Sequence, residues 1–293
     1  MPKNFNRKNH IKFISEVCSN HNSNLPRALN FVDKSAEIGC YSVKFQLFKI
    51  SKLFAPEIIE KSKTHKFREK WELNPQFIEK IANRCLKKQI YFSCTPFYLD
   101  AVDYLKEYVK FFKIASYELL WDDLLQKCAE TKKPVIISTG MASFKEIERA
   151  YKKLKNFGCK DISIMHCVSN YPAKLGDCNL STISKLKSKL KCKVGWSDHS
   201  KSFDVIARSI HKWKSEMVEF HMDLDGKGVE YNFGHCWLPS EIRPLIRHFN
   251  GPHLYDGKPK IYPTESEKKE QKWRRDPIDG YRPIISTRKK FNR

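Results

Sequence analysis

Short apolar stretches alternate with longer amphipathic ones along most of this chain. Eight of the apolar stretches have the length and composition of buried strands, and they span residues 11–17, 41–47, 90–94, 109–116, 134–138, 161–167, 193–199 and 216–223. Near-continuous apolar strands are typical of a parallel sheet that is covered on both faces. Polar residues gather where these stretches end. One example is KIASYE, which runs from Lys113 through Ser116 to Glu118.

The segments between the strands have helical periodicity. We expect helices near residues 26–37, 74–87, 98–108, 120–131, 143–156, 180–190, 203–212 and 239–249, with Pro26 at the start of the first and Gly39 after its end. Eight regular strand–helix units predict an α/β protein with a (β/α)₈ TIM barrel. An open doubly wound sheet is the alternative, but it requires neither eight units nor polar residues after every strand.

Two segments depart from this regular alternation. Residues 48–72 are longer than an ordinary strand–helix loop, so we expect an insertion over the strand ends. We expect a barrel domain over residues 1–250 and a C-terminal tail over 251–293, which is rich in proline, glycine and charge. Because the tail contains Tyr262, Trp273 and Tyr281, we expect it to pack on a barrel or on a partner subunit.

Composition is consistent with a globular cytoplasmic protein. The 293 residues are 41% hydrophobic, no run approaches the roughly 18 apolar residues of a membrane span, and no signal peptide is evident at the start. The ten cysteines are scattered, without a CxxC pair or a spacing typical of metal ligands. We therefore expect reduced, buried thiols and no membrane association.

The net charge of +22 raises the possibility of nucleic-acid binding. However, the 55 lysines and arginines are spread along the helical segments, and the densest run, at 268–275, contains a glutamate. We therefore expect no nucleic-acid partner. A basic surface would also attract small anionic substrates such as phosphates.

A TIM barrel brings the polar residues at its strand ends together on one rim. Lysines and hydroxyls there suit a phosphate, two histidines from adjacent strands suit a metal ion, and carboxylates suit acid–base chemistry. The converging residues are Glu16, Lys44, Gln46, Thr95, Lys113, Ser116, Glu118, Ser138, Ser169, Ser197, His199 and His221.

Each of these residues also has a structural interpretation when it is taken alone. His199 and His221 suit hydrogen-bonded structural roles, Glu118 suits an ion pair with Lys113, and Ser138 suits a helix cap. Their convergence at successive strand ends favours a functional site. His21 and His166 are weaker candidates, since His166 lies on an apolar strand.

Seven segments in order and spacing resemble the sialic acid synthase family, the phosphoenolpyruvate-dependent nonulosonate synthases. The similarity covers about residues 11–250, in the segments EVCSNHNSNLPRAL, YSVKFQLFK, SCTPFYLDAVDYL, KIASYE, PVIISTGMAS, HCVSNYPA and GWSDHS. The resemblance implies a transferase that joins phosphoenolpyruvate to an open-chain N-acyl hexosamine such as N-acetylmannosamine. The products would be a sialic-acid-type nonulosonate and phosphate, and the enzyme would be a homodimer.

The resemblance also implies roles for individual residues. Phosphoenolpyruvate would be bound by Lys44, Thr95, Lys113, Ser116, Ser138, Ser169 and Ser197. A divalent ion, Mn²⁺ or Mg²⁺, would be held by His199 and His221. Catalytic residues would be Glu16, Glu118 and Lys113, and the sugar would face Gln46, Tyr171 and Glu230.

Three departures from the family pattern concern the sugar side. Tyr117 stands where the family usually has glycine, and GKGVEYNFGHCWLP replaces the usual loop after His221. We also expect this chain to lack the C-terminal antifreeze-like domain that supplies an arginine to the sugar, with Arg274 or Arg275 as hypothetical replacements. Two alternatives stay open: a synthase for another aldose or aldose phosphate, and a catalytically silent barrel that binds a sugar or phosphate.

Overall fold

Eight parallel strands close into a barrel in chain order, which confirms the predicted (β/α)₈ fold. This computed structural model describes residues 10–251, 259 and 261–291. The strands are β1 (Lys12–Glu16), β2 (Ser42–Leu47), β3 (Tyr91–Pro96), β4 (Phe111–Ile114), β5 (Val135–Ser138), β6 (Ile162–Cys167), β7 (Lys193–Asp198) and β8 (Met217–His221). Pairing of β1 with β8 closes the barrel and sets Glu16 beside His221.

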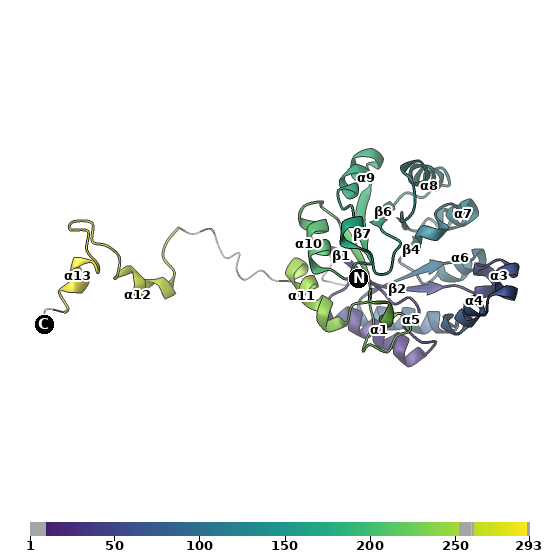
Figure 1. The fold of residues 1–293 in the computed structure, drawn as a ribbon, viewed down its shortest axis with the longest axis horizontal. Helices are drawn as coiled ribbons and strands as arrows, with labels where there is room; N and C mark the ends of the chain where they lie inside the picture. The colour runs from purple at the N-terminus through teal and green to yellow at the C-terminus, as the bar shows by residue number, and fades with distance from the viewer. Residues whose placement is uncertain (1–9, 252–258, 260, 292–293) are drawn as a thin grey trace. The chain divides into compact units, whose positions relative to one another are not determined.

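Helices surround the strands, as Figure 1 shows. They are α1 (Leu25–Glu37), α5 (Phe77–Lys88), α6 (Leu99–Leu105), α7 (Asp122–Glu130), α8 (Phe144–Asn156), α9 (Thr182–Leu190), α10 (Phe203–His211) and α11 (Pro239–Asn250). Local signals fix their ends. The Asn24 side chain caps α1 just before Pro26, Gly39 follows it with φ +90°, and a Ser143–Glu146 capping box starts α8.

The apolar core has two parts, one between the strands and the helices and one inside the barrel. The inner part consists of Ile14, Phe111, Ile136, Met165 and Met217, with Tyr41 packed against it. Strand side chains alternate between faces, so residues two positions further along each strand also face inward. Those residues are Glu16, Lys113, Ser138, Cys167 and Glu219. An apolar layer therefore lies beneath a polar layer at the carboxyl ends of the strands.

The expected insertion at residues 48–72 is built from short helices. These are α2 (Ile50–Leu53), α3 (Pro56–Lys61), α4 (Lys63–Phe67) and the 3₁₀ turn η1 (Arg68–Trp71). The Ile50 N–H donates to Glu72 Oε1 at 2.6 Å, and Ser23 Oγ donates to the Lys70 and Glu72 carbonyls. These bonds fix the insertion beside the loop that follows β1.

The chain divides into two units, Met1–Gly251 and Pro252–Arg293. The described part of the second unit contains η5 (Glu265–Glu267), α12 (Lys268–Gln271) and α13 (Ile285–Arg288). Asp276 organises it by accepting hydrogen bonds from the Ile278 and Ile285 N–H groups at 3.0 and 2.7 Å. Whether this unit packs on a barrel or a partner subunit stays a prediction.

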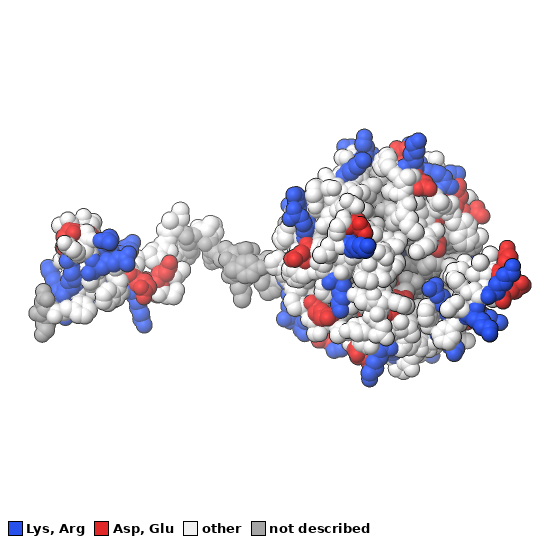
Figure 2. Space-filling view, viewed as in Figure 1, with Lys and Arg blue, Asp and Glu red and all other residues white. Residues whose placement is uncertain are grey.

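The cysteines are mostly buried, and the basic residues are spread over the surface. All ten cysteines fall within the described residues, and each is unpaired; nine are buried and Cys192 is half-buried. Figure 2 shows lysine and arginine scattered around the barrel face, with aspartate and glutamate among them. Within the described residues, no helix combines the length and the apolar character needed to cross a bilayer.

Candidate active site

A cavity of about 700 Å³ opens at the carboxyl ends of the strands. Its size is typical of pockets for small ligands. The insertion forms one wall through Phe48, Ile50, Leu53, Phe54, Arg68 and Trp71. The strand ends and the loops after them supply its polar lining, which includes Lys44, Gln46, Lys113, Ser116, Glu118, Ser138, Tyr171, Ser197, His199, Glu219, His221, Glu230 and His235.

Two lysines and two carboxylates form a buried ion cluster at the base of the cavity. Lys113 Nζ lies 2.9 Å and Lys44 Nζ lies 3.6 Å from Glu219 Oε1, and Lys44 also pairs with Glu16. Burial lowers the pKa of Lys44 to about 8, although Glu219 opposes the shift. Burial would raise the pKa of Glu219, but Lys113 and Lys44 outweigh it and lower that pKa to about 2. The cluster therefore holds Glu219 ionised between two ammonium groups.

Hydroxyl groups gather beside these lysines. Ser116 Oγ accepts a hydrogen bond from the Gly140 N–H at 3.0 Å and lies 3.2 Å from Cys167 Sγ. Position 140 requires glycine because two serine side chains approach its backbone closely. A Cβ there would clash with Ser169 Oγ and lie 2.9 Å from Ser116 Oγ. Ser169 therefore lies near Ser116, although the cavity lining includes Ser116, Ser138 and Ser197 and not Ser169. Thr95 lies deeper, where its hydroxyl accepts from Lys44 Nζ at 3.2 Å.

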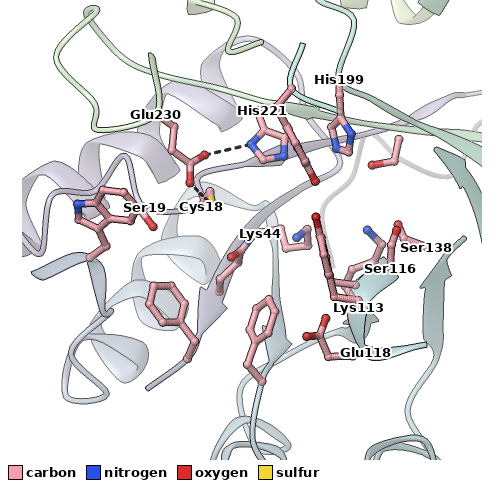
Figure 3. Close-up of a pocket in the computed structure, with 18 of the residues that line it drawn as sticks. Cys18, Ser19, Lys44, Lys113, Ser116, Glu118, Ser138, His199, His221 and Glu230 are labelled. Atoms are coloured by element: carbon pink, nitrogen blue, oxygen red, sulfur yellow. Dashed lines mark hydrogen bonds and ion pairs between the residues drawn. The ribbon is translucent and has the colours of Figure 1, made fainter. Parts of the chain in front are cut away.

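Imidazole rings cluster on the opposite side of the cavity, where Figure 3 shows His199 beside His221 and Glu230 reaching His221. The His199 and His221 ring centroids are 5.2 Å apart, and His235 adds a third ring 4.6 Å from His221. His199 Nδ1 lies 2.6 Å from the Val168 carbonyl, which fixes the ring and leaves Nε2 available as a ligand. Burial, reinforced by His221, lowers the pKa of His199 to about 3.

These residues fit a divalent metal ion. Neutral imidazoles are good ligands for such ions, and a carboxylate beside them completes a typical donor set. Glu230 Oε2 is buried without a hydrogen-bond partner and lies 3.4 Å from His221 Nδ1. Glu230 Oε1 accepts from Cys18 Sγ at 2.6 Å. Burial would raise the pKa of Glu230, but its contacts with His221 and His235 outweigh that effect and lower the pKa.

Glu118 does not form the ion pair with Lys113 that its sequence position allowed. Lys113 pairs with Glu219 instead, because Glu219 lies within the barrel at the same level. Glu118 follows β4 in the turn η2 (Ser116–Glu118), and its Oε2 is buried without a hydrogen-bond partner. Burial raises its pKa to about 7. A carboxyl group of this kind can exchange a proton near neutral pH.

The three expected sugar-facing residues all line the cavity. Gln46 extends from β2, and the Tyr171 ring lies 4.2 Å from the His199 ring. Glu230 contacts the imidazoles described above. Tyr117 also lines the cavity and keeps 68% of its surface exposed.

Sequence reasoning missed Glu219, His235, Cys236 and Cys18. Alternation along β8 was a usable signal for Glu219, since it precedes His221 by two positions and faces the same way. No comparable signal marked His235 and Cys236, which lie in an irregular loop. His21 and His166 have protein partners: the Ser23 N–H donates to His21 Nδ1 at 3.0 Å, and His166 Nε2 lies 2.8 Å from the Cys178 carbonyl.

A family model and individual relatives of this chain point to the same protein family. The NeuB family matches residues 31–259. An uncharacterized protein of Methanocaldococcus jannaschii is 36% identical over 87% of this chain and 74% of its own length. The N,N'-diacetyllegionaminic acid synthase of Campylobacter jejuni is 33% identical over 72% of this chain and 67% of its own.

A solved structure agrees with these sequence matches. The N-acetylneuraminic acid (sialic acid) synthetase of Leptospira borgpetersenii superposes with a TM-score of 0.77 at 30% identity, covering 89% of this chain and 90% of that one. The family model covers most of the barrel, and the structural superposition covers 89% of the chain. The chain belongs to the NeuB family.

Proposed function

We propose that this protein condenses phosphoenolpyruvate with the aldehyde of an open-chain N-acyl hexosamine, giving a nonulosonate and phosphate. The observation that carries the proposal is one cavity in which two buried lysines and several hydroxyls face a cluster of imidazoles. Family relatives named as legionaminic acid, pseudaminic acid and N-acetylneuraminate-9-phosphate synthases support this reaction class.

The lysine side of the cavity suits phosphoenolpyruvate, which carries a carboxylate and a phosphate. Lys44 and Lys113 supply positive charge, and Ser116, Ser138 and Ser197 supply hydroxyl donors. Buried cations and hydroxyls bind such anions more strongly than exposed ones, because the surroundings screen the charges less. Thr95 and Ser169 would support this set from behind, through Lys44 and beside Ser116.

In the reaction, the methylene carbon of phosphoenolpyruvate forms a bond to the aldehyde carbon of the sugar. The aldehyde oxygen becomes a hydroxyl by gaining a proton, and water adds to the former enol carbon. The tetrahedral intermediate then expels phosphate by C–O cleavage and leaves a ketone. Glu16, paired with Lys44, and Glu118, with its pKa near 7, are the proposed proton-transfer groups.

His199 and His221 would hold a divalent ion, Mn²⁺ or Mg²⁺, on the sugar side. When bound, that ion supplies Lewis acidity toward the sugar carbonyl. Gln46 and Tyr171 would orient the sugar, since both line the cavity. Tyr117 also lines the cavity, and relatives differ in the sugars that their names imply, which favours testing several acceptors.

The test is phosphate release from phosphoenolpyruvate with N-acetylmannosamine and Mn²⁺, beside a His199→Ala variant. Release that requires the sugar and disappears in the variant would establish the reaction class. Release with another aldose or aldose phosphate alone would retain the reaction and change the acceptor. Absence of release across the whole acceptor panel would refute the proposal and favour a silent binding barrel.

A further inference from the structure

A group of possible metal ligands within the described residues shares His221 with the imidazole cluster but does not include His199. The donor atoms of His221, Glu230, His235 and Cys236 all lie within 4.8 Å of one another. His221 Nδ1 is 3.3 Å from His235 Nε2 and 3.4 Å from Glu230 Oε2. His235 Nε2 is 3.8 Å from both Glu230 Oε2 and Cys236 Sγ.

These separations are close to those of a tetrahedral metal site. Nitrogen and oxygen ligands about 2.0 to 2.1 Å from a zinc-like ion in tetrahedral geometry lie about 3.3 to 3.4 Å from each other and about 3.5 to 3.6 Å from a sulfur ligand. The 3.3 and 3.4 Å separations from His221 Nδ1 match these values. The two 3.8 Å separations from His235 Nε2 exceed them by a few tenths of an ångström, so a small movement of the His235 side chain would complete the geometry.

We propose that His221, Glu230, His235 and Cys236 form a four-ligand site for a thiophilic divalent ion such as Zn²⁺ or Co²⁺. The inference rests on the proposed function through His221, which both ligand sets share, and an ion held by these four residues would take the place of one held by His199 and His221. Binding displaces the proton of the Cys236 thiol to solvent, and the resulting thiolate becomes the softest of the four ligands.

The surrounding backbone holds the loop ligands in place. The Trp237 N–H donates to the His221 carbonyl at 2.8 Å, and the Asp223 N–H donates to the Trp237 carbonyl at 2.9 Å. This short ladder places Cys236 directly beside the end of β8. The loop between them is tied down by Asp223, which accepts from the Gly228 N–H at 3.2 Å and pairs with Arg27 at 2.6 Å.

Asn20 orients the two remaining ligands from the loop after β1. Its Nδ2 lies 3.5 Å from Cys236 Sγ and donates to the Met222 carbonyl at 3.0 Å. Its Oδ1 accepts from the Glu230 N–H at 2.8 Å. Asn20 therefore contacts the sulfur of one proposed ligand and the backbone of another, as expected for a support that orients metal ligands.

The group is buried at the wall of the cavity. His221, His235 and Cys236 are 6%, 2% and 0% exposed, and His221, Glu230 and His235 line the cavity. A buried cluster containing a carboxylate needs a compensating charge, and a divalent ion would supply it. Glu230 Oε2, which has no hydrogen-bond partner, lies among the three other donors.

The test is titration of the metal-free protein with Co²⁺, followed by absorption spectroscopy without substrates. We expect the intense visible bands of tetrahedral Co²⁺ and a near-ultraviolet band from thiolate-to-cobalt charge transfer. Cys236→Ser should remove the charge-transfer band and weaken Co²⁺ binding by about 100-fold or more, since loss even of groups supporting a ligand costs 10- to 100-fold. Cys18→Ser is the matched control, because this neighbouring thiol contacts Glu230 and lies outside the four ligands; it should keep the band.

Other outcomes would overturn the site. His199→Ala should retain the sulfur band; if it abolishes binding while Cys236→Ser leaves the spectrum unchanged, the ion is held by His199 and His221 instead. Loss of the band in Cys18→Ser alone, or no Co²⁺ binding, also refutes the proposal. X-ray absorption of the zinc-loaded wild type, with a sulfur neighbour expected at about 2.3 Å, avoids dependence on variant folding. Because neither readout uses turnover, failure of this site and failure of the synthase reaction are distinguishable.

Discussion

Glu118 should make the stability of this protein depend on pH in an unusual direction. Its side chain is 8% exposed, and Oε2 has no hydrogen-bond partner. Burial raises its pKa from 4.5 to about 7, so the folded protein binds this proton more tightly than the unfolded chain does. The perturbation is Glu118→Gln, which keeps the shape of the protonated side chain and removes its titration.

The sign follows from proton linkage. Between pH 4.5 and about 7 the unfolded chain releases the Glu118 proton while the folded protein retains it, so the stability of the wild type falls as pH rises. A difference of about 2.5 between the two pKa values, at about 1.4 kcal/mol for each, gives at most about 3.5 kcal/mol well above pH 7. The variant should therefore be more stable than the wild type by up to about 3 kcal/mol at pH 8, and by less than about 1 kcal/mol at pH 5.

Urea unfolding of both proteins at several values between pH 5 and 8 measures this difference. Glu79→Gln, which alters an exposed carboxylate on α5, is the control and should leave the pH dependence as in the wild type. Parallel stability profiles for the wild type and Glu118→Gln, or a less stable variant at pH 8, would refute the reasoning about burial.

Two further substitutions test the architecture of the cavity. Glu219→Gln removes a carboxylate that pairs with Lys44 and Lys113, and it should lower the free energy of unfolding in urea by about 3 to 5 kcal/mol. The control is Glu216→Gln, which alters an exposed carboxylate just before β8 and should lower that free energy little. Equal losses of stability in the two variants would contradict the buried ion cluster. Gly140→Ala places a methyl group against Ser116 and Ser169, and it should raise the KM for phosphoenolpyruvate at least about tenfold. Gly176→Ala is the control, because its Cβ would meet nothing within 4 Å. An unchanged KM in Gly140→Ala would show that these hydroxyls do not bind phosphoenolpyruvate.

The barrel was predictable because its pattern is repeated and local. Each strand is a short apolar run, and polar residues follow where it ends, as Phe111 precedes Lys113 on β4 and Ile136 precedes Ser138 on β5. Parallel strands in a closed barrel bring such ends together whatever the detail of the loops. The strand and helix positions therefore followed from periodicity, with end points that differ from the observed ones by at most three residues.

The pairing of charges was less accessible from the sequence. Glu118 is close to Lys113 along the chain, yet Lys113 pairs with Glu219, which is 106 positions away. Only the closed barrel brings β4 and β8 to face each other across its interior. His235 and Cys236 were missed for a related reason, since a loop without periodicity reaches the site through the backbone bonds of Trp237.

Strand β8 connects the two halves of the site. Glu219 and His221 are two residues apart and face the same side, so Glu219 lies with Lys44 and Lys113 while His221 lies with Glu230 and His235. Pairing of Glu16 with His221 on one edge and Ser197 with Glu219 on the other fixes that register. A slip by one residue would turn both side chains toward the helices. The arrangement of lysines and the arrangement of imidazoles therefore depend on the same strand pairing, which explains how one short segment, MVEFH, supports both.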